Sequence, residues 1–326
     1  MIELKNNQLD FHFPEVHPDA RCSIEFERTL RLPDDNREYD LPPGLGEFPL
    51  MHVDDLGERL PSRWKKTGGV FFPMYQAEAM WINFQSDYPF AIKIAAGKIN
   101  AITGDPWSNP LQANPQDYLV LPEQPWLDGF CVAKGTIRQF VAMPLGESYT
   151  AEEQLTEDAE HGGIQIIAYP MKRDVYEKLV KYDQPVFSHC VMIAETVNDM
   201  DMGLAPGGLM SQEIYDDAYG LSAWNTDVYS RCYVQIANSR DYQHLTGHAP
   251  PTRVPTAEAY TQAGLPWFEY YDENATALPG SQTLAGLDSV AAKGIKKGES
   301  PLPENMPVTP VDIVKLGATA VREGEF

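Results

Sequence analysis

The segment Cys22–Leu32, CSIEFERTLRL, contains the clearest fold signal in the sequence. Ile24, Phe26 and Leu30 alternate with charged residues, so one side of an extended chain is apolar and the other is polar. This alternation is typical of a β-strand that packs one face on a core. We therefore expect a half-buried strand here.

Strand patterns of the same kind recur along the chain. The segment FAIKIAAGKINAITG predicts a hairpin over Phe90–Gly104 that turns near Gly97–Lys98. A second hairpin is expected over Tyr118–Met143, with the turn at Asp128–Gly129 between its arms. Further core strands are expected over 163–169, 186–194 and 231–237.

Helix signals are fewer and short. Thr150 with Glu153 forms the sequence pattern of a capping box, and Asp174 with Glu177 repeats it. Thr256 is expected to cap a third helix, which would end before Gly264. These helices are expected at the periphery.

Together the patterns predict a mainly β or α+β fold with an antiparallel β-sandwich-like core, a few short peripheral helices and long Pro/Gly loops. The 27 prolines and 24 glycines are spread through the chain and mark no linker. We expect one large domain over residues 1–288. The segment 289–326 is expected to be an extended, proline-rich C-terminal arm, lying on its own domain or on a neighbouring subunit.

Charge and hydropathy exclude several classes of partner. The 326 residues carry a formal net charge of −22, which repels phosphate backbones and argues against a nucleic-acid partner. The N-terminus lacks the pattern of a secretory signal, and no apolar run approaches the length of a membrane span. The four cysteines lie far apart, which fits neither a disulfide framework nor a zinc site. We expect a soluble, cytoplasmic protein with no membrane partner.

Several strings also carry a family resemblance. They are GGVFFPMYQAEAMW at 68–81, KIAAGKINAITG at 93–104, GLAPGG at 203–208, RCYVQIANS at 231–239 and GLPWFEYYDE at 264–273. In these the chain resembles an uncharacterised family of bacterial and fungal proteins, some of them labelled integral membrane proteins. The resemblance implies no activity. Its membrane label conflicts with the hydropathy, and we follow the hydropathy.

One candidate ligand site is the aromatic and acidic cluster PWFEYYDE at 266–273. Aromatic faces beside carboxylates can stack a sugar or hold a cationic ligand. The ligand-binding residues would be Trp267, Tyr270, Tyr271 and Asp272. The alternative is that this patch closes the end of a β-sandwich or packs at a subunit interface.

A candidate metal site follows the predicted strand 186–194. Asp199 and Asp201 lie on an irregular segment with Glu213 downstream, and carboxylates suit a divalent cation such as Ca²⁺. The EF-hand pattern fails because Gly203 stands where a third ligand is needed. The alternative is a solvated acidic loop.

Motifs of the common catalytic classes are absent, namely GxSxG, GxxxxGK[ST], GxGxxG and HExxH. Whether the chain is an enzyme therefore stays open. We expect a non-enzymatic protein that acts by self-association or partner binding, as a homo-oligomer. The alternatives are a small-molecule or carbohydrate binder around Trp267, and a metal-assisted hydrolase using Asp199, Asp201 and Glu213.

Overall fold

The computed structural model describes residues 1–59, 61–179, 201–247, 254–270 and 275–316. The predicted strand at 22–32 is present as β3 (Arg21–Thr29). Ile24 and Phe26 point into the main hydrophobic cluster and are fully buried. The predicted strand at 186–194 lies outside the described residues.

Strands make up most of the described chain. In the first half they are β1 (Ile2–Lys5), β2 (Gln8–His12), β3, β4 (Glu38–Tyr39), β5 (Gly44–Glu47), β6 (Met51–His52), β7 (Val70–Met74), β8 (Ala79–Gln85), β9 (Phe90–Ala96) and β10 (Ile99–Asn100). The remaining strands are β11 (Leu119–Leu121), β12 (Trp126–Leu127), β13 (Gly129–Ala133), β14 (Thr136–Pro144), β15 (Ile164–Pro170), β16 (Met202–Ser211), β17 (Ser230–Asn238), β18 (Trp267–Glu269) and β19 (Ile313–Lys315).

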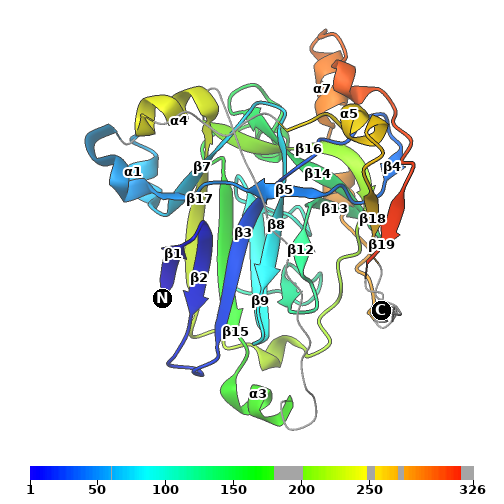
Figure 1. The fold of residues 1–326 in the computed structure, drawn as a ribbon. Helices are drawn as coiled ribbons and strands as arrows, with labels where there is room; N and C mark the ends of the chain where they lie inside the picture. Colours follow the sequence, from blue (N-terminus) through cyan, green and yellow to red (C-terminus); the bar gives the residue numbers. More distant parts are fainter. Residues whose placement is uncertain (60, 180–200, 248–253, 271–274, 317–326) are drawn as a thin grey trace, which may run out of the picture.

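Strands β1 to β17 belong to one connected sheet, in which the pairings are antiparallel except for β4 with β16 and β7 with β17. The long pairs β3–β8, β14–β16 and β9–β15 form its frame (Figure 1). The prediction of a mainly β, antiparallel fold is confirmed. The layers expected to stack as a sandwich are hydrogen-bonded into this single sheet.

The core has one large cluster and smaller satellites. Phe26, Phe48 and Phe72 stack in the large cluster, with ring centroids 5.2 Å apart for Phe26–Phe72 and 4.8 Å apart for Phe48–Phe72. Full burial of one such side chain stabilises the fold by roughly 1.5–3 kcal/mol. This packing fixes β3 against β7 and positions the other face of β3 for the site described below.

The helices are short and lie at the ends of the sheet (Figure 1). They are α1 (Trp64–Thr67), α2 (Ala151–Thr156), α3 (Arg173–Leu179), α4 (Ser239–Thr246), α5 (Ala257–Gln262), α6 (Gln282–Ala285) and α7 (Val290–Lys296), with 3-10 helices η1 (Val53–Arg59), η2 (Leu221–Ala223) and η3 (Pro303–Asn305). The capping box of Thr150 and Glu153 and the cap of Thr256 are confirmed. Helix α3 begins one residue before Asp174, which lies in its first turn.

The two predicted hairpins have different outcomes. The turn at Gly97–Lys98 is confirmed, since both residues have positive φ between β9 and β10. The turn expected at Asp128–Gly129 is wrong, because β13 turns into β14 only after Ala133. Gly129 instead lets β13 come close to β14, since a Cβ at this position would lie 1.9 Å from the carbonyl oxygen of Arg138. Asp128 therefore lies outside the hairpin turn, and it lines a pocket described below.

The described part of the predicted arm, residues 289–316, lies on its own domain. Ser289 caps α7, and Val290 packs in a cluster with Val141. Strand β19 pairs in parallel with β18 as a second, two-stranded sheet. At Val290–Lys296 the segment is helical and not extended as expected.

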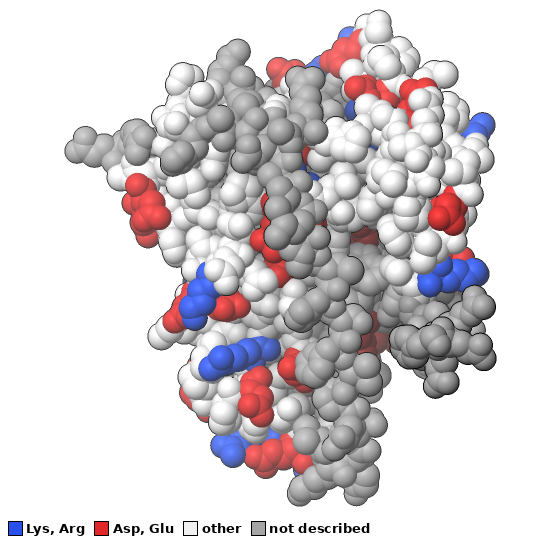
Figure 2. Space-filling view, in the orientation of Figure 1, with Lys and Arg blue, Asp and Glu red and all other residues white. Residues whose placement is uncertain are grey.

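Among the described helices, none has the length and apolar character that crossing a bilayer requires. Acidic side chains are spread over the face shown in Figure 2 and do not gather in one patch.

Candidate aromatic and acidic pocket

The outer face of the central strands carries polar and aromatic side chains. In the β3–β8 ladder Glu25 lies opposite Asn83 and Glu27 lies opposite Trp81. Trp126 of β12 also lies opposite Asn83. Because directly opposed residues share a face of a sheet, these five side chains lie on the same side.

The register places a sixth side chain in this row. Leu127 lies opposite Ile82, and both point into the main cluster. Since side chains alternate along an extended chain, Asp128 emerges on the other side, next to Trp81. Glu27 of β3, Trp81 of β8 and Asp128, which directly follows β12, thus form one row.

A pocket of about 380 Å³ opens over this row. Its other walls come from the segment around β5, from β18 and from the residue after β19. The described residues that line it are Glu27, Leu41, Pro42, Pro43, Gly44, Gly46, Trp81, Trp126, Asp128, Phe268 and Leu316.

Asp128 is one of two buried acids of the pocket, with 4% of its surface exposed. Its Oδ2 has no hydrogen-bond partner among the described residues. Burial raises the pKa of Asp128 to about 7, against a smaller opposing effect of a hydrogen bond with Trp126. The Asp128 backbone is held in place, because its N–H donates to Gln212 Oε1 at 3.0 Å and its carbonyl accepts from Phe140 N–H at 2.9 Å.

Glu27 is the second buried acid, also 4% exposed. Burial raises its pKa to about 7, repulsion from Glu25 and Glu47 adds to the rise, and a backbone hydrogen bond from Gly46 opposes it. Both acids of the pocket are therefore poised to exchange a proton near neutral pH.

Aromatic rings form the walls. The Trp81 and Trp126 rings meet edge to face with centroids 6.5 Å apart, and Tyr270 meets Trp126 in the same way at 4.8 Å. The Trp81 Nε1 atom is buried and has no hydrogen-bond partner among the described residues. This donor and the Asp128 acceptor are both buried within residues that line the pocket.

Gly44 keeps the pocket open. A Cβ at this position would lie 3.1 Å from Trp81 Cζ2 and 3.5 Å from Glu27 Oε2. Any side chain here would enter the space between the indole ring and the carboxyl group.

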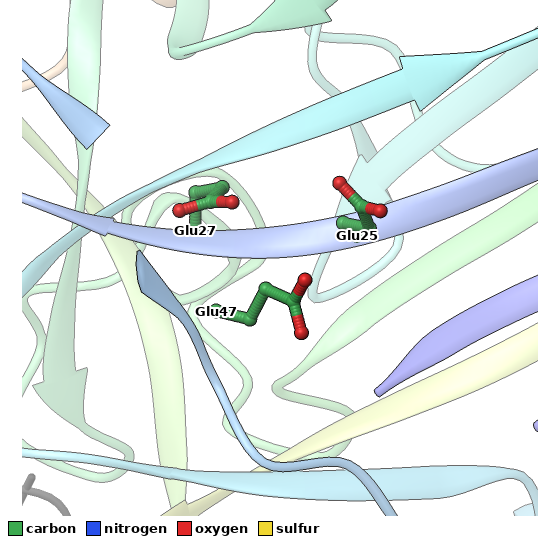
Figure 3. A group of neighbouring side chains, drawn as sticks. All are labelled: Glu25, Glu27 and Glu47. Carbon is green, nitrogen blue, oxygen red and sulfur yellow. The ribbon is translucent and has the colours of Figure 1, made fainter. Parts of the chain in front are cut away.

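Three carboxyl groups gather beside the pocket (Figure 3). Glu25 and Glu27 of β3 and Glu47 of β5 can bring one oxygen each within 4.8 Å of the others. Such a group can hold a hard divalent cation. However, both Glu25 oxygens already accept hydrogen bonds from side-chain amides, those of Gln8, Asn83 and Gln85. We assign no metal to this cluster.

No protein-family model, curated protein or solved structure matches this chain. The site must therefore be interpreted from its own chemistry. The family resemblance of the sequence stays a prediction.

The predicted ligand residues surround this pocket only in part. Trp267 is fully buried in the second hydrophobic cluster, and its Nε1 donates to Thr261 Oγ1 at 3.2 Å. Its strand neighbour Phe268 lines the pocket, and Tyr270 packs on Trp126. Tyr271 and Asp272 lie outside the described residues.

The predicted metal residues are not brought together where the structure describes them. Asp201 precedes β16 and pairs with Arg63, whereas Glu213 follows the far end of the same strand. The ten extended residues of β16 lie between Asp201 and Glu213 and hold them about 30 Å apart. Asp199 lies outside the described residues.

Sequence reasoning missed Glu27, Trp81 and Asp128 as site residues. The alternation of 22–32 placed Glu27 on the polar side of β3, which is correct, but gave no sign that β5 and β18 cover that side. Asp128 was not considered as a site residue because the pair Asp128–Gly129 predicts a turn.

Proposed function

We propose that the protein binds a small neutral hydroxylated ligand, a sugar or a similar polyol, in the aromatic and acidic pocket. The observation that carries this proposal is the lining of the pocket, where two indole rings, Trp81 and Trp126, lie beside two acids, Glu27 and Asp128. A hydroxyl group both donates and accepts hydrogen bonds, so it can pair with a carboxyl group in either protonation state.

The walls and the size of the pocket support the same ligand class. A volume of about 380 Å³ lies within the range of small-molecule sites and can hold a monosaccharide or a disaccharide. The indole rings offer apolar faces on which the C–H face of a sugar ring can pack.

The charge of the pocket favours neutral hydroxylated ligands over anionic ones. The pocket has two acids, Glu27 and Asp128, and no lysine or arginine among its described lining residues. An anionic ligand would be repelled by the ionised acids in a partly desolvated site. Neutral sugars are therefore favoured over sugar acids and sugar phosphates.

The test is a thermal-shift and calorimetry panel of glucose, galactose, N-acetylglucosamine and maltose, with glucuronate as the anionic counterpart. We expect saturable binding of at least one neutral sugar and none of glucuronate. Gly44→Ala should weaken that binding by about tenfold or more, since its methyl group would occupy the space between Trp81 and Glu27.

The matched control is Gly286→Ala. A Cβ on Gly286 would meet only ordinary contacts at 3.5 Å, and this residue does not line the pocket. Its affinity should equal that of the wild type. Absence of binding across the neutral sugars, or equal affinities of Gly44→Ala and the wild type, would refute the proposal.

Self-association is a second candidate, favoured by a specific observation. Large apolar side chains are exposed along the C-terminal segment, at Ile295, Leu302, Met306, Val311 and Ile313. Exposed apolar groups gathered on one segment are typical of an interaction surface. A second copy of the chain is the partner proposed for this surface.

Native mass spectrometry of the full chain tests this candidate. We expect a discrete oligomer for the wild type and a monomer for the double variant Ile295→Lys/Met306→Lys. Both side chains are more than 60% exposed, so the charges should leave the fold intact. A monomeric wild type at tens of micromolar, or an oligomer that survives both lysines, would dismiss it.

A further inference from the structure

A second cavity of about 560 Å³ lies apart from the aromatic and acidic pocket and shares no described lining residue with it. Its volume is within the range of small-molecule sites. It is formed where the loop after β10, the segment between β16 and β17 and the segment that leads into α6 come together. Three acids line it, Asp105, Asp216 and Asp217, and its described lining residues include no lysine or arginine.

Hydrogen bonds between residues far apart in sequence hold the walls of this cavity together. The Gln116 side chain accepts from the Asp217 N–H at 2.8 Å and donates to the Tyr215 carbonyl oxygen at 3.2 Å. The Ser281 hydroxyl donates to the Thr103 carbonyl oxygen at 2.5 Å. Because the three segments are already fixed, a ligand that enters the cavity has little ordering of the walls to drive.

Asp217 is a structural acid of the wall. Its Oδ1 accepts from the N–H groups of Tyr219 and Gly220 at 2.8 and 3.0 Å. Its Oδ2 accepts from the Tyr118 hydroxyl at 2.6 Å and from the Trp224 indole at 2.8 Å. Four donors therefore occupy its two oxygens, so Asp217 acts on a ligand through its charge rather than by direct contact.

Asp105 and Asp216 are the acids that a ligand can contact, because both are exposed. Their oxygens and those of Asp217 do not come within 4.8 Å of one another as a set, as the three acids beside the first pocket do. One metal ion therefore cannot be held by all three carboxyl groups. A ligand with several separated positive charges can match them.

We propose that this cavity binds an aliphatic polyamine. Its ammonium groups donate to the carboxylates of Asp105 and Asp216 as charge-assisted hydrogen bonds. Its methylene chain lies against the apolar residues of the lining, Leu221, Leu278 and Pro279. The formal net charge of −22 attracts such a polycation to the protein, and a neutral or anionic ligand would leave the acids of the cavity without a counter-charge.

Calorimetry of the full chain with spermidine tests the proposal, with octanediol as a neutral counterpart and Mg²⁺ as a compact dication. The buffer contains about 0.15 M salt, which screens attraction between distant exposed charges. We expect saturable binding of spermidine, at least about tenfold tighter than that of Mg²⁺, and no binding of octanediol. Absence of saturable spermidine binding, or equal affinities for spermidine and Mg²⁺, would overturn the proposal.

Two matched pairs of variants then locate the site. Leu221 and Leu265 are 40% and 44% exposed, so a lysine should leave the fold intact at either position, but only Leu221 lines the cavity. Leu221→Lys should weaken spermidine binding at least about tenfold through charge repulsion, and Leu265→Lys should leave it nearly unchanged.

The second pair removes one negative charge in each variant. Asp216→Asn should weaken spermidine binding about fivefold, whereas Asp158→Asn, at an exposed position outside the cavity, should leave it unchanged. Equal effects within either pair would show that spermidine responds only to the overall charge of the protein, and the cavity would then be excluded as its site.

Discussion

Replacing Arg28 with alanine is expected to lower the free energy of unfolding by about 3–5 kcal/mol, as is typical when one partner of a buried ion pair is removed. Arg28 and Glu78 are 1% and 5% exposed, and the Arg28 Nε and Nη2 atoms donate to Glu78 Oε1 at 3.1 and 2.6 Å. The guanidinium also lies 5.2 Å from the centroid of the Phe48 ring.

The loss is large because Glu78 stays behind without its counter-charge. Burial raises the pKa of Glu78, and Arg28 is the main influence that opposes the rise. Without Arg28 the carboxyl group must either remain charged in the interior or take up a proton. Glu78 Oε2 also accepts from the Tyr75 N–H at 2.8 Å, so the start of β8 should loosen with it.

Urea unfolding measures this effect, and a double-mutant cycle with Arg28→Met and Glu78→Met isolates the pair. The double variant should be more stable than the sum of the two single changes predicts, because neither charge is then left alone. Arg173→Ala, which breaks the exposed pair with Glu177 on α3, should change stability by less than about 0.5 kcal/mol. A comparably small effect of Arg28→Ala would contradict our account of the buried pair.

The stability of the protein is expected to fall as the pH rises from 5 to 8, and Asp128→Asn should reduce that fall by about 2–3 kcal/mol. The pKa of Asp128 is raised to about 7 in the folded protein, so the folded state binds more protons than the unfolded state between about pH 4 and 7. Stability therefore decreases as the pH rises through this window and levels off above it.

Urea unfolding of the wild type and Asp128→Asn at pH 5 and pH 8 measures this difference. Asp174→Asn is the matched control, because Asp174 is an exposed aspartate on α3 and its replacement should leave the pH dependence unchanged. Parallel pH dependences in the wild type and Asp128→Asn would show that Asp128 does not titrate in the folded protein as we infer. Glu27→Gln should act in the same direction, since the pKa of Glu27 is also raised to about 7.

Local patterns predicted much of the fold. The alternation at 22–32, the turn at Gly97–Lys98 and the capping box of Thr150 and Glu153 all appear in the structure. Each depends on neighbours within a few residues, because strand alternation, turn conformation and helix capping are set by short-range sterics and hydrogen bonds.

The candidate site was predicted only at its edge. The aromatic and acidic segment at 266–273 does reach the pocket through Phe268 and Tyr270. The sequence predicted Trp267 as a ligand residue, yet the alternation of β18 directs it into the second hydrophobic cluster. The sequence shows that aromatic and acidic residues are present in this segment. Which of them line the pocket depends on the face of the strand from which each side chain projects.

The sequence by itself determined the secondary structure of the central strands and the antiparallel, mainly β class, because these follow from periodicity along the chain. Only the tertiary structure decided that Glu27, Trp81 and Asp128 form one row, since their alignment depends on the register of three strands separated in sequence. It also decided that β5 and β18 lie over this row, where Glu27 and Asp128 are buried. Burial of that kind is a property of the assembled fold, and it raises the pKa of both acids and leaves two polar atoms without partners.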